Sequence, residues 1–287
     1  MTVDDDLAAW LGRIESHSAL FEPERLRSRM EALDELDALI PECREIRVAS
    51  LFAHVLALRE QLEAANGAVY AAIRDELRRG AGAEHLRKWI SQCGDAGAPH
   101  PGIAYDHLDE LIAGVLDLHE PVTQTALEPE MVFYQPTPVR HTLEMIRLSE
   151  LGEGDVLIDL GSGLGHVPIL ASILTGARTI GVEIDPALRR CASECAQRLG
   201  LGRVTFLEGD AREADLSLGT VFHLYTPFTG AMLRAVLDRL QSEAERRAIR
   251  VCSLGPCASA VAEEPWLKSR TAVDSERITC FVSQTTS

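Results

Sequence analysis

The chain has 287 residues, of which 46% are hydrophobic and 25% charged, and this is the composition of an ordinary globular protein. Its 44 acidic and 28 basic residues give a net charge of −16. Such a balance disfavours tight binding to bare nucleic acid or anionic lipid, because Lys and Arg must neutralise the phosphates of those partners. We therefore expect neither nucleic acid nor a membrane as a partner.

Two further features of the composition bear on the compartment. No stretch approaches the roughly 20 apolar residues that a membrane helix needs, and residues 1–6 lack the basic and apolar character of a signal peptide. The seven cysteines form no CxxC pair, so reduced thiols are expected. Together these features predict a cytoplasmic protein, whose oligomeric state the sequence leaves open.

The N-terminal part of the chain has the spacing of amphipathic helices. Leu7, Trp10, Leu11 and Ile14 follow the i, i+3, i+4, i+7 pattern of a helix that buries one face. Similar runs predict helices over residues 22–39, 47–64, 67–79, 83–93 and 105–118. Residues 1–128 contain 24 acidic and 12 basic residues, a net charge of −12. We predict an all-helical lobe over residues 1–128 that caps the acceptor side of a second domain.

From about residue 155 the pattern changes to short apolar strands that alternate with helices. The predicted strands are 156–160, 178–184, 204–207, 220–225 and 248–253, with helices near 165–175, 186–199 and 229–245 between them. Two further strand-like runs, 266–273 and 278–283, are joined by a polar turn. Alternation of this kind predicts an α/β fold with a doubly wound, mostly parallel seven-strand sheet and an antiparallel C-terminal hairpin.

The strongest motif is Asp159-Leu-Gly161-Ser-Gly163-Leu-Gly165, which directly follows a predicted strand and opens a helix. Glycines allow a ligand to approach the backbone closely, and a helix N-terminus attracts negative groups. Taken alone the motif also fits a structural turn. Glu183 and Asp210 strengthen the functional interpretation, since they end the second and third strands, where carboxylates can grip a ribose and an adenine amine.

The spacing of these motifs resembles that of class I, seven-strand, Rossmann-like S-adenosylmethionine-dependent methyltransferases, over about residues 129–287. The resemblance implies S-adenosylmethionine as cofactor and a methyltransferase domain over residues 129–287. It also implies that Asp159 holds the methionine moiety, Glu183 the ribose and Asp210 the adenine. The remaining cofactor-binding residues implied are Gly161, Gly163, Gly165, Ile184 and Ala211.

A second, local resemblance precedes the first strand. Residues 133–138, Phe-Tyr-Gln-Pro-Thr-Pro, followed by a helix and the glycine motif, are similar to the layout of seven-strand protein-lysine methyltransferases of the disruptor-of-telomeric-silencing type. By this resemblance Tyr134 and Thr137 contact the methionine end of the cofactor. The alternative is a plain turn, because prolines flank Thr137.

Two residues at the end of the fourth strand are candidate catalytic groups. Tyr225 stands where amino-methylating relatives often carry Asn or Asp before Pro, and its hydroxyl can line the acceptor pocket. His223, two residues earlier, points to the same side of the sheet and can act as a general base. A structural histidine and a packing tyrosine are the alternatives. The histidine spacings predict no metal site.

The sequence thus predicts an enzyme that transfers a methyl group to an N or O nucleophile, either a protein lysine or a small amine or hydroxyl acceptor, by in-line displacement. The acidic lobe suits a basic acceptor by long-range attraction, although an acidic surface also serves solubility. One alternative is a catalytically silent cofactor-binding subunit whose helical lobe docks a partner protein. A weaker alternative is a nucleotide-dependent oxidoreductase, whose glycine motif is usually Gly-x-Gly-x-x-Gly.

Overall fold

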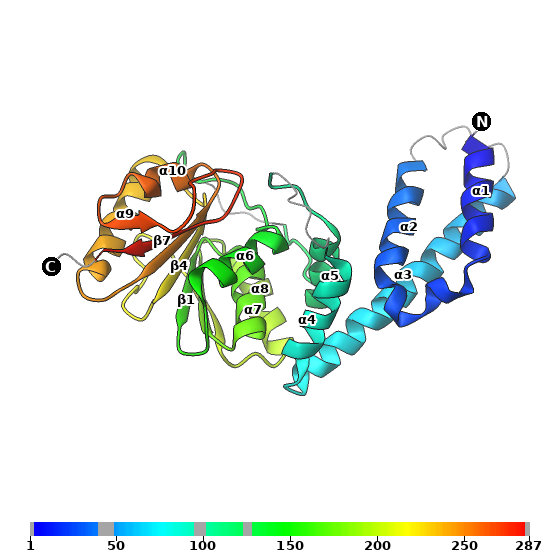
Figure 1. Ribbon diagram of the computed structural model, residues 1–287, viewed down its shortest axis with the longest axis horizontal. Helices are drawn as coiled ribbons and strands as arrows, with labels where there is room; N and C mark the ends of the chain where they lie inside the picture. The colour runs from blue at the N-terminus through cyan, green and yellow to red at the C-terminus, as the bar shows by residue number, and fades with distance from the viewer. Residues whose placement is uncertain (1–2, 40–48, 95–101, 123–127, 285–287) are drawn as a thin grey trace.

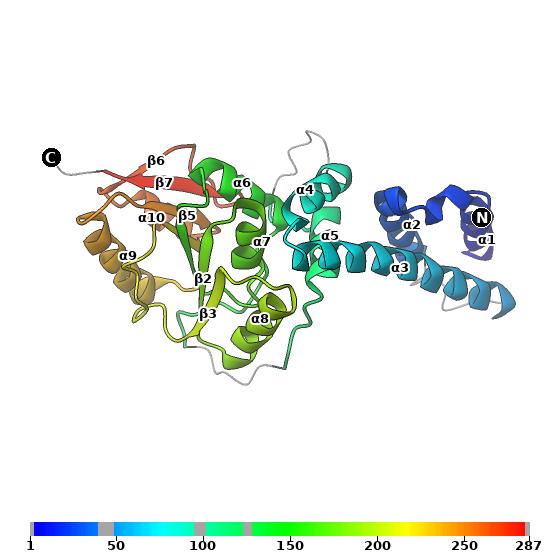
Figure 2. The same cartoon turned by 90° about the horizontal axis from the view of Figure 1, so that it is seen from below.

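The computed structural model describes residues 3–39, 49–94, 102–122 and 128–284. Within them, a mixed sheet covered by helices forms one part, and N-terminal helices extend away from it (Figures 1 and 2). These helices are α1 (Val3–Glu15), α2 (Leu26–Leu39), α3 (Ala49–Arg78), α4 (Gly82–Cys93) and α5 (His107–Leu116), with short 3-10 turns η1 (Ser18–Phe21) and η2 (Pro23–Arg25) before α2. The predicted helical character of this region is confirmed.

One prediction in this region is wrong. The two helices expected over 47–64 and 67–79 are a single helix, α3, of 30 residues, and residues 47 and 48 lie outside the described part of the chain. Gly67 does not break the helix, although an interior glycine costs about 1 kcal/mol relative to alanine. Burial of Leu62 and Val69, on either side of Gly67, offsets that cost.

The C-terminal part is a seven-strand sheet in the order β3-β2-β1-β4-β5-β7-β6. Its strands are β1 (Val156–Leu160), β2 (Arg178–Glu183), β3 (Val204–Glu208), β4 (Val221–Tyr225), β5 (Arg250–Leu254), β6 (Leu267–Ser269) and β7 (Thr279–Ser283). The first five strands are parallel, while β7 runs antiparallel to both β5 and β6. The predicted fold class, including the C-terminal antiparallel hairpin, is confirmed.

Helices cover both faces of this sheet. They are α6 (Val139–Ser149), α7 (His166–Thr175), α8 (Pro186–Arg198), α9 (Gly230–Ala244) and α10 (Cys257–Ala262). Strand residues of alternating parity pack against α9 and α10 on one face and against α6 and α7 on the other. Helix α10 is not among the sequence predictions, because its six residues are too few for a helical period to stand out.

The helical region and the sheet share a hydrophobic core. One cluster of buried side chains includes Val69, Ile73 and Leu111 from α3 and α5 together with Ile169 of α7 and Phe206 of β3. A separate cluster packs α1 against the C-terminal half of α2 and the N-terminal half of α3. The domain boundary at residue 128 stays a prediction. Among the described residues, no helix has the length and apolar character required to cross a bilayer.

Candidate cofactor and acceptor site

A large pocket opens at the carboxyl ends of the central strands, with a volume of about 710 Å³. Its walls come from the glycine turn after β1, the ends of β2 and β4, the turn after β3 and a segment, residues 128–138, that crosses above them. Strand ends of an open parallel sheet form such a crevice where the strand order reverses, here between β1 and β4. The volume suits a nucleoside-sized ligand together with part of a second one.

The glycine turn forms the floor of this pocket. The backbone N–H groups of Gly161 and Ser162 both donate to the carbonyl of Val182, at 2.9 and 3.0 Å. Gly163 has a φ of +53°, and a Cβ added to it would lie 2.0 Å from the ring of Tyr134. Only glycine therefore allows the aromatic ring to lie directly on the turn. Gly165 begins α7 in the same left-handed conformation, with a φ of +80°.

Glu183 connects the end of β2 to this turn. Its two carboxylate oxygens accept hydrogen bonds from the backbone N–H groups of Gly163, at 2.7 Å, and Asp185, at 2.8 Å. Burial raises the pKa of this carboxyl group, against the lowering effect of the two backbone donors. Each oxygen retains a further lone pair, so Glu183 both fixes the turn and presents an acceptor to the pocket that it lines.

Asp210, at the turn after β3, is held by a neighbour that sequence reasoning missed. The Arg212 guanidinium donates to its carboxylate at 2.9 and 2.5 Å, and the same guanidinium contacts Glu128 at 3.2 Å. The hydrogen bond from Arg212 holds the pKa of Asp210 below its usual range. Arg212 thereby connects the turn after β3 to the start of the segment over residues 128–138.

The segment over residues 128–138 is fastened to the end of β4. Val132 donates its backbone N–H to the carbonyl of Pro227 at 3.1 Å, and Thr229 donates to the carbonyl of Glu130 at 2.8 Å. The Tyr134 hydroxyl lies 3.2 Å from Nδ1 of His166, the first residue of α7. Burial raises the pKa of Tyr134. The segment thus forms a strap across the pocket rather than a free loop.

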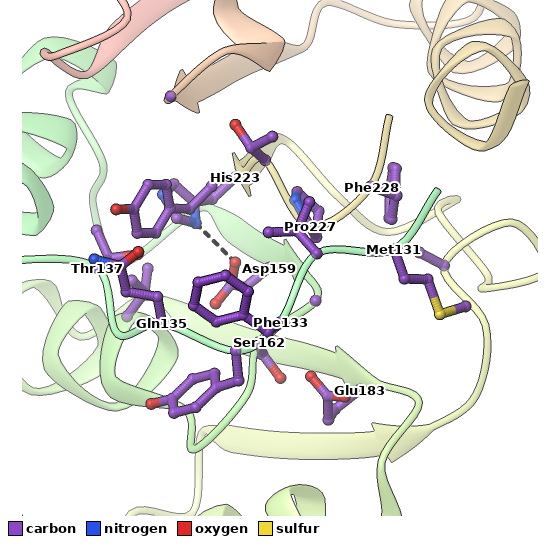
Figure 3. A pocket seen from close by; sticks show the side chains of 18 of the residues that line it. Met131, Phe133, Gln135, Thr137, Asp159, Ser162, Glu183, His223, Pro227 and Phe228 are labelled. Carbon is purple, nitrogen blue, oxygen red and sulfur yellow. Dashed lines mark hydrogen bonds and ion pairs between the residues drawn. The ribbon is translucent and has the colours of Figure 1, made fainter. Parts of the chain in front are cut away.

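The two candidate catalytic residues lie at the far wall of the pocket. His223 Nδ1 is 2.7 Å from Oδ1 of Asp159, and both side chains are buried (Figure 3). The other ring nitrogen of His223 and the hydroxyl of Tyr225 are buried without a hydrogen-bond partner in the described structure. Burial also raises the pKa of Tyr225. Asp159 therefore has a protein partner that the sequence did not reveal.

Most of the sequence-predicted residues come together at this pocket. The following line it: Tyr134, Thr137, Asp159, Gly161, Glu183, Ile184, Asp210, Ala211, His223 and Tyr225. Gly163 and Gly165 do not line it but support it, under Tyr134 and at the start of α7. The structure adds Phe133 and Gln135 from the same strap, and Ile103, Glu120 and Glu276 from more distant segments.

The residues present suit S-adenosylmethionine. Glu183 ends β2, Asp210 lies in the turn after β3, and both line one pocket, which is the arrangement that an adenosine group needs. Ser162 Oγ is buried in the same turn without a partner in the described structure, which leaves a donor for a polar ligand group. Gly161 also lines the pocket, and only its lack of a side chain leaves room for Pro227, because an added Cβ would lie 2.5 Å from the Cβ of that proline.

Comparison with known proteins finds methyltransferases that are similar to this chain. No family profile matches the chain. A protein-lysine N-methyltransferase of Saccharolobus islandicus is 29% identical over 94 residues, which cover 32% of this chain and 58% of that protein. A ribosomal RNA small subunit methyltransferase A of Phenylobacterium zucineum is 40% identical over 86 residues, 29% of each chain.

One solved structure is also similar to this chain. The RNA methyltransferase of Salinibacter ruber in complex with S-adenosyl-L-homocysteine is 31% identical, covers 53% of this chain and 95% of its own, and has a TM-score of 0.43. The curated relatives identify this chain as a relative of the S-adenosylmethionine-dependent methyltransferases, and its seven-strand sheet fits their class I fold. The predicted methyltransferase class and its S-adenosylmethionine cofactor are thereby confirmed. This methyltransferase spans between about a quarter and three fifths of the curated relatives that it matches.

The comparisons also correct one expectation. The net charge of −16 led us to expect no nucleic acid as a partner. Two relatives are ribosomal RNA small subunit methyltransferases, from Phenylobacterium zucineum and Caulobacter vibrioides. The expectation that nucleic acid is not a partner is therefore wrong. Net charge describes the whole surface, whereas contact with a nucleic acid depends on a local face.

Proposed function

We propose that this chain transfers a methyl group from S-adenosylmethionine to an amine nitrogen, with the acceptor entering beside His223 and Tyr225. The observation that carries the proposal is the pocket of about 710 Å³ over a glycine turn, with Glu183 hydrogen-bonded to the backbone of that turn. When bound, the cofactor supplies a methyl group carried on a sulfonium sulfur, and after transfer the rest of the cofactor is a neutral thioether. The protein has to align the acceptor and exclude water.

The cofactor would occupy the side of the pocket that the strand ends form. Glu183 would accept from the ribose hydroxyls and Asp210 from the adenine amine, while Tyr134 and Thr137 on the strap would enclose the methionine end. The remaining contacts would come from Asp159, Gly161, Ile184 and Ala211. Gly163 and Gly165 would contribute by shaping the turn beneath.

The charge of the pocket favours a cationic acceptor. Six carboxylates line it, and no lysine or arginine among the described residues does so. Three of the six, Asp159, Glu183 and Asp210, are assigned above to the cofactor. Glu120 and Glu276 come from segments outside the glycine turn and the strand ends, and they attract a protonated amine. We therefore favour a protein lysine or a small amine.

The helical region contributes to this acceptor side. Ile103 and Glu120, both within residues 1–128, line the pocket. Phe133 on the strap is 70% exposed although it lines the pocket, so an apolar side chain stands at the entrance. A long aliphatic chain that ends in an amine suits an apolar entrance leading to carboxylates. This supports the role of residues 1–128 as a substrate lobe.

A second candidate acceptor is RNA. The ribosomal RNA methyltransferases among the relatives favour it, since they match this chain at 40% and 35% identity. A base that carries an exocyclic amine would reach the same pocket only after leaving its stack. The aromatic ring of Phe133 at the entrance would then stack on the extruded base.

The first experiment is a calorimetric titration with S-adenosylmethionine and S-adenosylhomocysteine, with NADH as comparator. We expect micromolar binding of both sulfur ligands and none of NADH. In the matched Glu183→Gln variant, which keeps one acceptor oxygen, affinity should fall by about 1–2 kcal/mol. Unchanged affinity would contradict this placement of the ribose, and NADH binding would favour the oxidoreductase.

The second experiment identifies the acceptor. Isolated small ribosomal subunits and a lysine-rich peptide are incubated with the protein and methyl-labelled S-adenosylmethionine, and the protein and RNA fractions are counted separately. Label on lysine supports the favoured acceptor, and label on RNA supports the second candidate. Tight cofactor binding without label in any fraction would favour the catalytically silent subunit.

A further inference from the structure

His223 has a buried nitrogen with no partner, and this nitrogen belongs to a side chain that lines the pocket. The side chain of His223 is 2% exposed, and Nε2 makes no hydrogen bond in the described structure. A buried polar atom without a partner destabilises the folded protein, because it has lost its hydrogen bonds to water. Such an atom in a pocket wall indicates a bond that forms only when a ligand is present.

The other ring nitrogen has a fixed partner, and the reason lies in the sheet. Strands β1 and β4 are parallel neighbours, and Asp159 is paired with His223 in their register. Residues opposite each other in a ladder point to the same face. The two side chains therefore meet on the face that α6 and α7 cover, with Nδ1 at 2.7 Å from Oδ1 of Asp159.

This contact determines where the imidazole carries its proton. An ionised carboxylate only accepts hydrogen bonds, so Nδ1 of a neutral His223 must be the donor. Nε2 is then left with its lone pair and can accept a proton. Figure 3 shows the contact between Asp159 and the His223 ring as a dashed line, in the pocket that the strap residues Phe133 and Gln135 also line.

We propose that Nε2 of His223 accepts the proton of an ammonium acceptor and that Asp159 is the positioning residue that keeps this nitrogen unprotonated and correctly oriented. The inference rests on the proposed function, and it specifies an acceptor that arrives as a cation. One N–H bond of the acceptor breaks, its electron pair stays on the nitrogen as the attacking lone pair, and the proton forms a new bond to Nε2. Asp159 then faces an imidazolium, and the proton leaves to water with the product.

Other titratable groups surround this histidine and must be separated from it in any test. Tyr225 follows on the same strand, and Cys252 lies opposite His223 in the ladder with β5. Tyr134, Glu183 and Glu276 line the same pocket from the strap, β2 and a C-terminal loop. A pH profile of turnover would combine all of these, so the test compares ligands and variants at one pH.

The test uses an S-adenosylmethionine analogue, sinefungin, in which a primary ammonium replaces the methylsulfonium, and S-adenosylhomocysteine, which has no donor there. Calorimetry at pH 7.5 measures both on the full chain. We expect the wild-type protein to prefer the ammonium ligand about 10-fold. His223→Phe should abolish that preference, whatever its effect on the affinity for both ligands together, and His223→Gln should restore part of the preference through its amide oxygen.

The positioning role of Asp159 has a spectroscopic readout. In wild-type protein the ¹⁵N shifts of His223, assigned by comparison with His223→Phe, should show Nδ1 protonated and Nε2 bare. Asp159→Asn should shift this balance toward the other tautomer. An unchanged tautomer there, or an undiminished ammonium preference in His223→Phe, would overturn this inference alone. If wild-type protein binds neither ligand, the proposed function falls and the inference with it.

Discussion

The helical bundle formed by α1, the C-terminal half of α2 and the N-terminal half of α3 differs from the sheet in the polar atoms that each leaves unpaired. In the bundle, these three helices bury a small apolar cluster that includes Trp10, Leu36 and Leu62. At the sheet, strand ends and glycines leave a pocket with unpaired polar atoms. The bundle therefore shows the character of a support, and the sheet that of a binding site.

A polar contact marks the place where the bundle meets the rest of the molecule. Arg29 of α2 is fully buried and donates to the side chain of Asn66 on α3 at 2.7 Å and to the carbonyl of Leu20 at 2.7 Å. Beyond it, α3 enters the cluster shared with α5 and α7. One 30-residue helix, α3, therefore belongs to two cores.

Removing one buried leucine from each core should show whether the two cores unfold separately. Leu62 and Leu111 are both fully buried leucines, one in the distal cluster and the other in the cluster shared with the sheet. Replacing either with alanine should lower the local free energy of unfolding by about 3 kcal/mol. Hydrogen exchange read by mass spectrometry should show loss of protection in α1 for Leu62→Ala and in α5 and α7 for Leu111→Ala.

Cofactor binding provides the control for this pair. S-adenosylmethionine should restore protection to α7 in Leu111→Ala, because a ligand of the native state stabilises the unit that binds it. It should leave α1 unprotected in Leu62→Ala. Equal loss of protection throughout the chain in both variants would show that the two cores unfold as one.

Local sequence patterns were sufficient for most of the fold and for the outline of the site. Strands β1 and β4 are short, mainly apolar runs, and the turn from Asp159 to Gly165 directly indicates a strand, a glycine turn and a helix. The carboxylates Glu183 and Asp210 follow from the rule that parallel strands end at one edge. These features need only neighbours in sequence, which is why they were predictable.

Contacts between distant residues were beyond the reach of those patterns. His223 and Asp159 are 64 positions apart, and their pairing depends on the register of β4 against β1. Arg212 on Asp210 is close in sequence, but nothing in its spacing distinguishes it from a solvated charge. The continuity of α3 through Gly67 depends on tertiary burial, which overrides a weak local preference.

At the sheet, the shape of the cofactor pocket depends on one backbone position, Gly163. Gly163→Ala places a methyl group within 2.0 Å of the Tyr134 ring, at a φ of +53°. We expect a loss of about 2 kcal/mol in unfolding free energy, from backbone strain and the displaced ring. Calorimetry should show that S-adenosylmethionine affinity falls at least 10-fold, because the floor of the pocket shifts.

Gly200 offers the matched control for that variant. It also has a left-handed backbone, with a φ of +71°, but no atom lies within 4 Å of an added Cβ. Gly200→Ala should therefore cost about 1 kcal/mol of stability and leave cofactor affinity unchanged. Equal affinity in the two variants would mean that Tyr134 and the turn do not shape the cofactor site.

A smaller effect, on the pH dependence of stability, is expected where α5 of the helical region contacts α6 beside the sheet. Asp109, near the start of α5, accepts hydrogen bonds from the backbone N–H groups of Asp106, at 2.8 Å, and Val139 of α6, at 2.7 Å. Burial outweighs these donors and raises the pKa of the carboxyl group to about 6. In the unfolded chain an aspartate titrates near 3.9.

The sign of the pH dependence follows from that difference. Because the folded pKa is the higher one, the folded state holds the proton more tightly, and its advantage is complete below about pH 4 and lost as the pH rises through 6. Urea unfolding at pH 4.5 and 7 should show wild-type protein losing about 1 kcal/mol relative to Asp109→Asn, a value reduced by partial solvent screening. Parallel profiles for the two proteins would show that the Asp109 carboxyl is hydrated and that the joint between α5 and α6 does not depend on its charge.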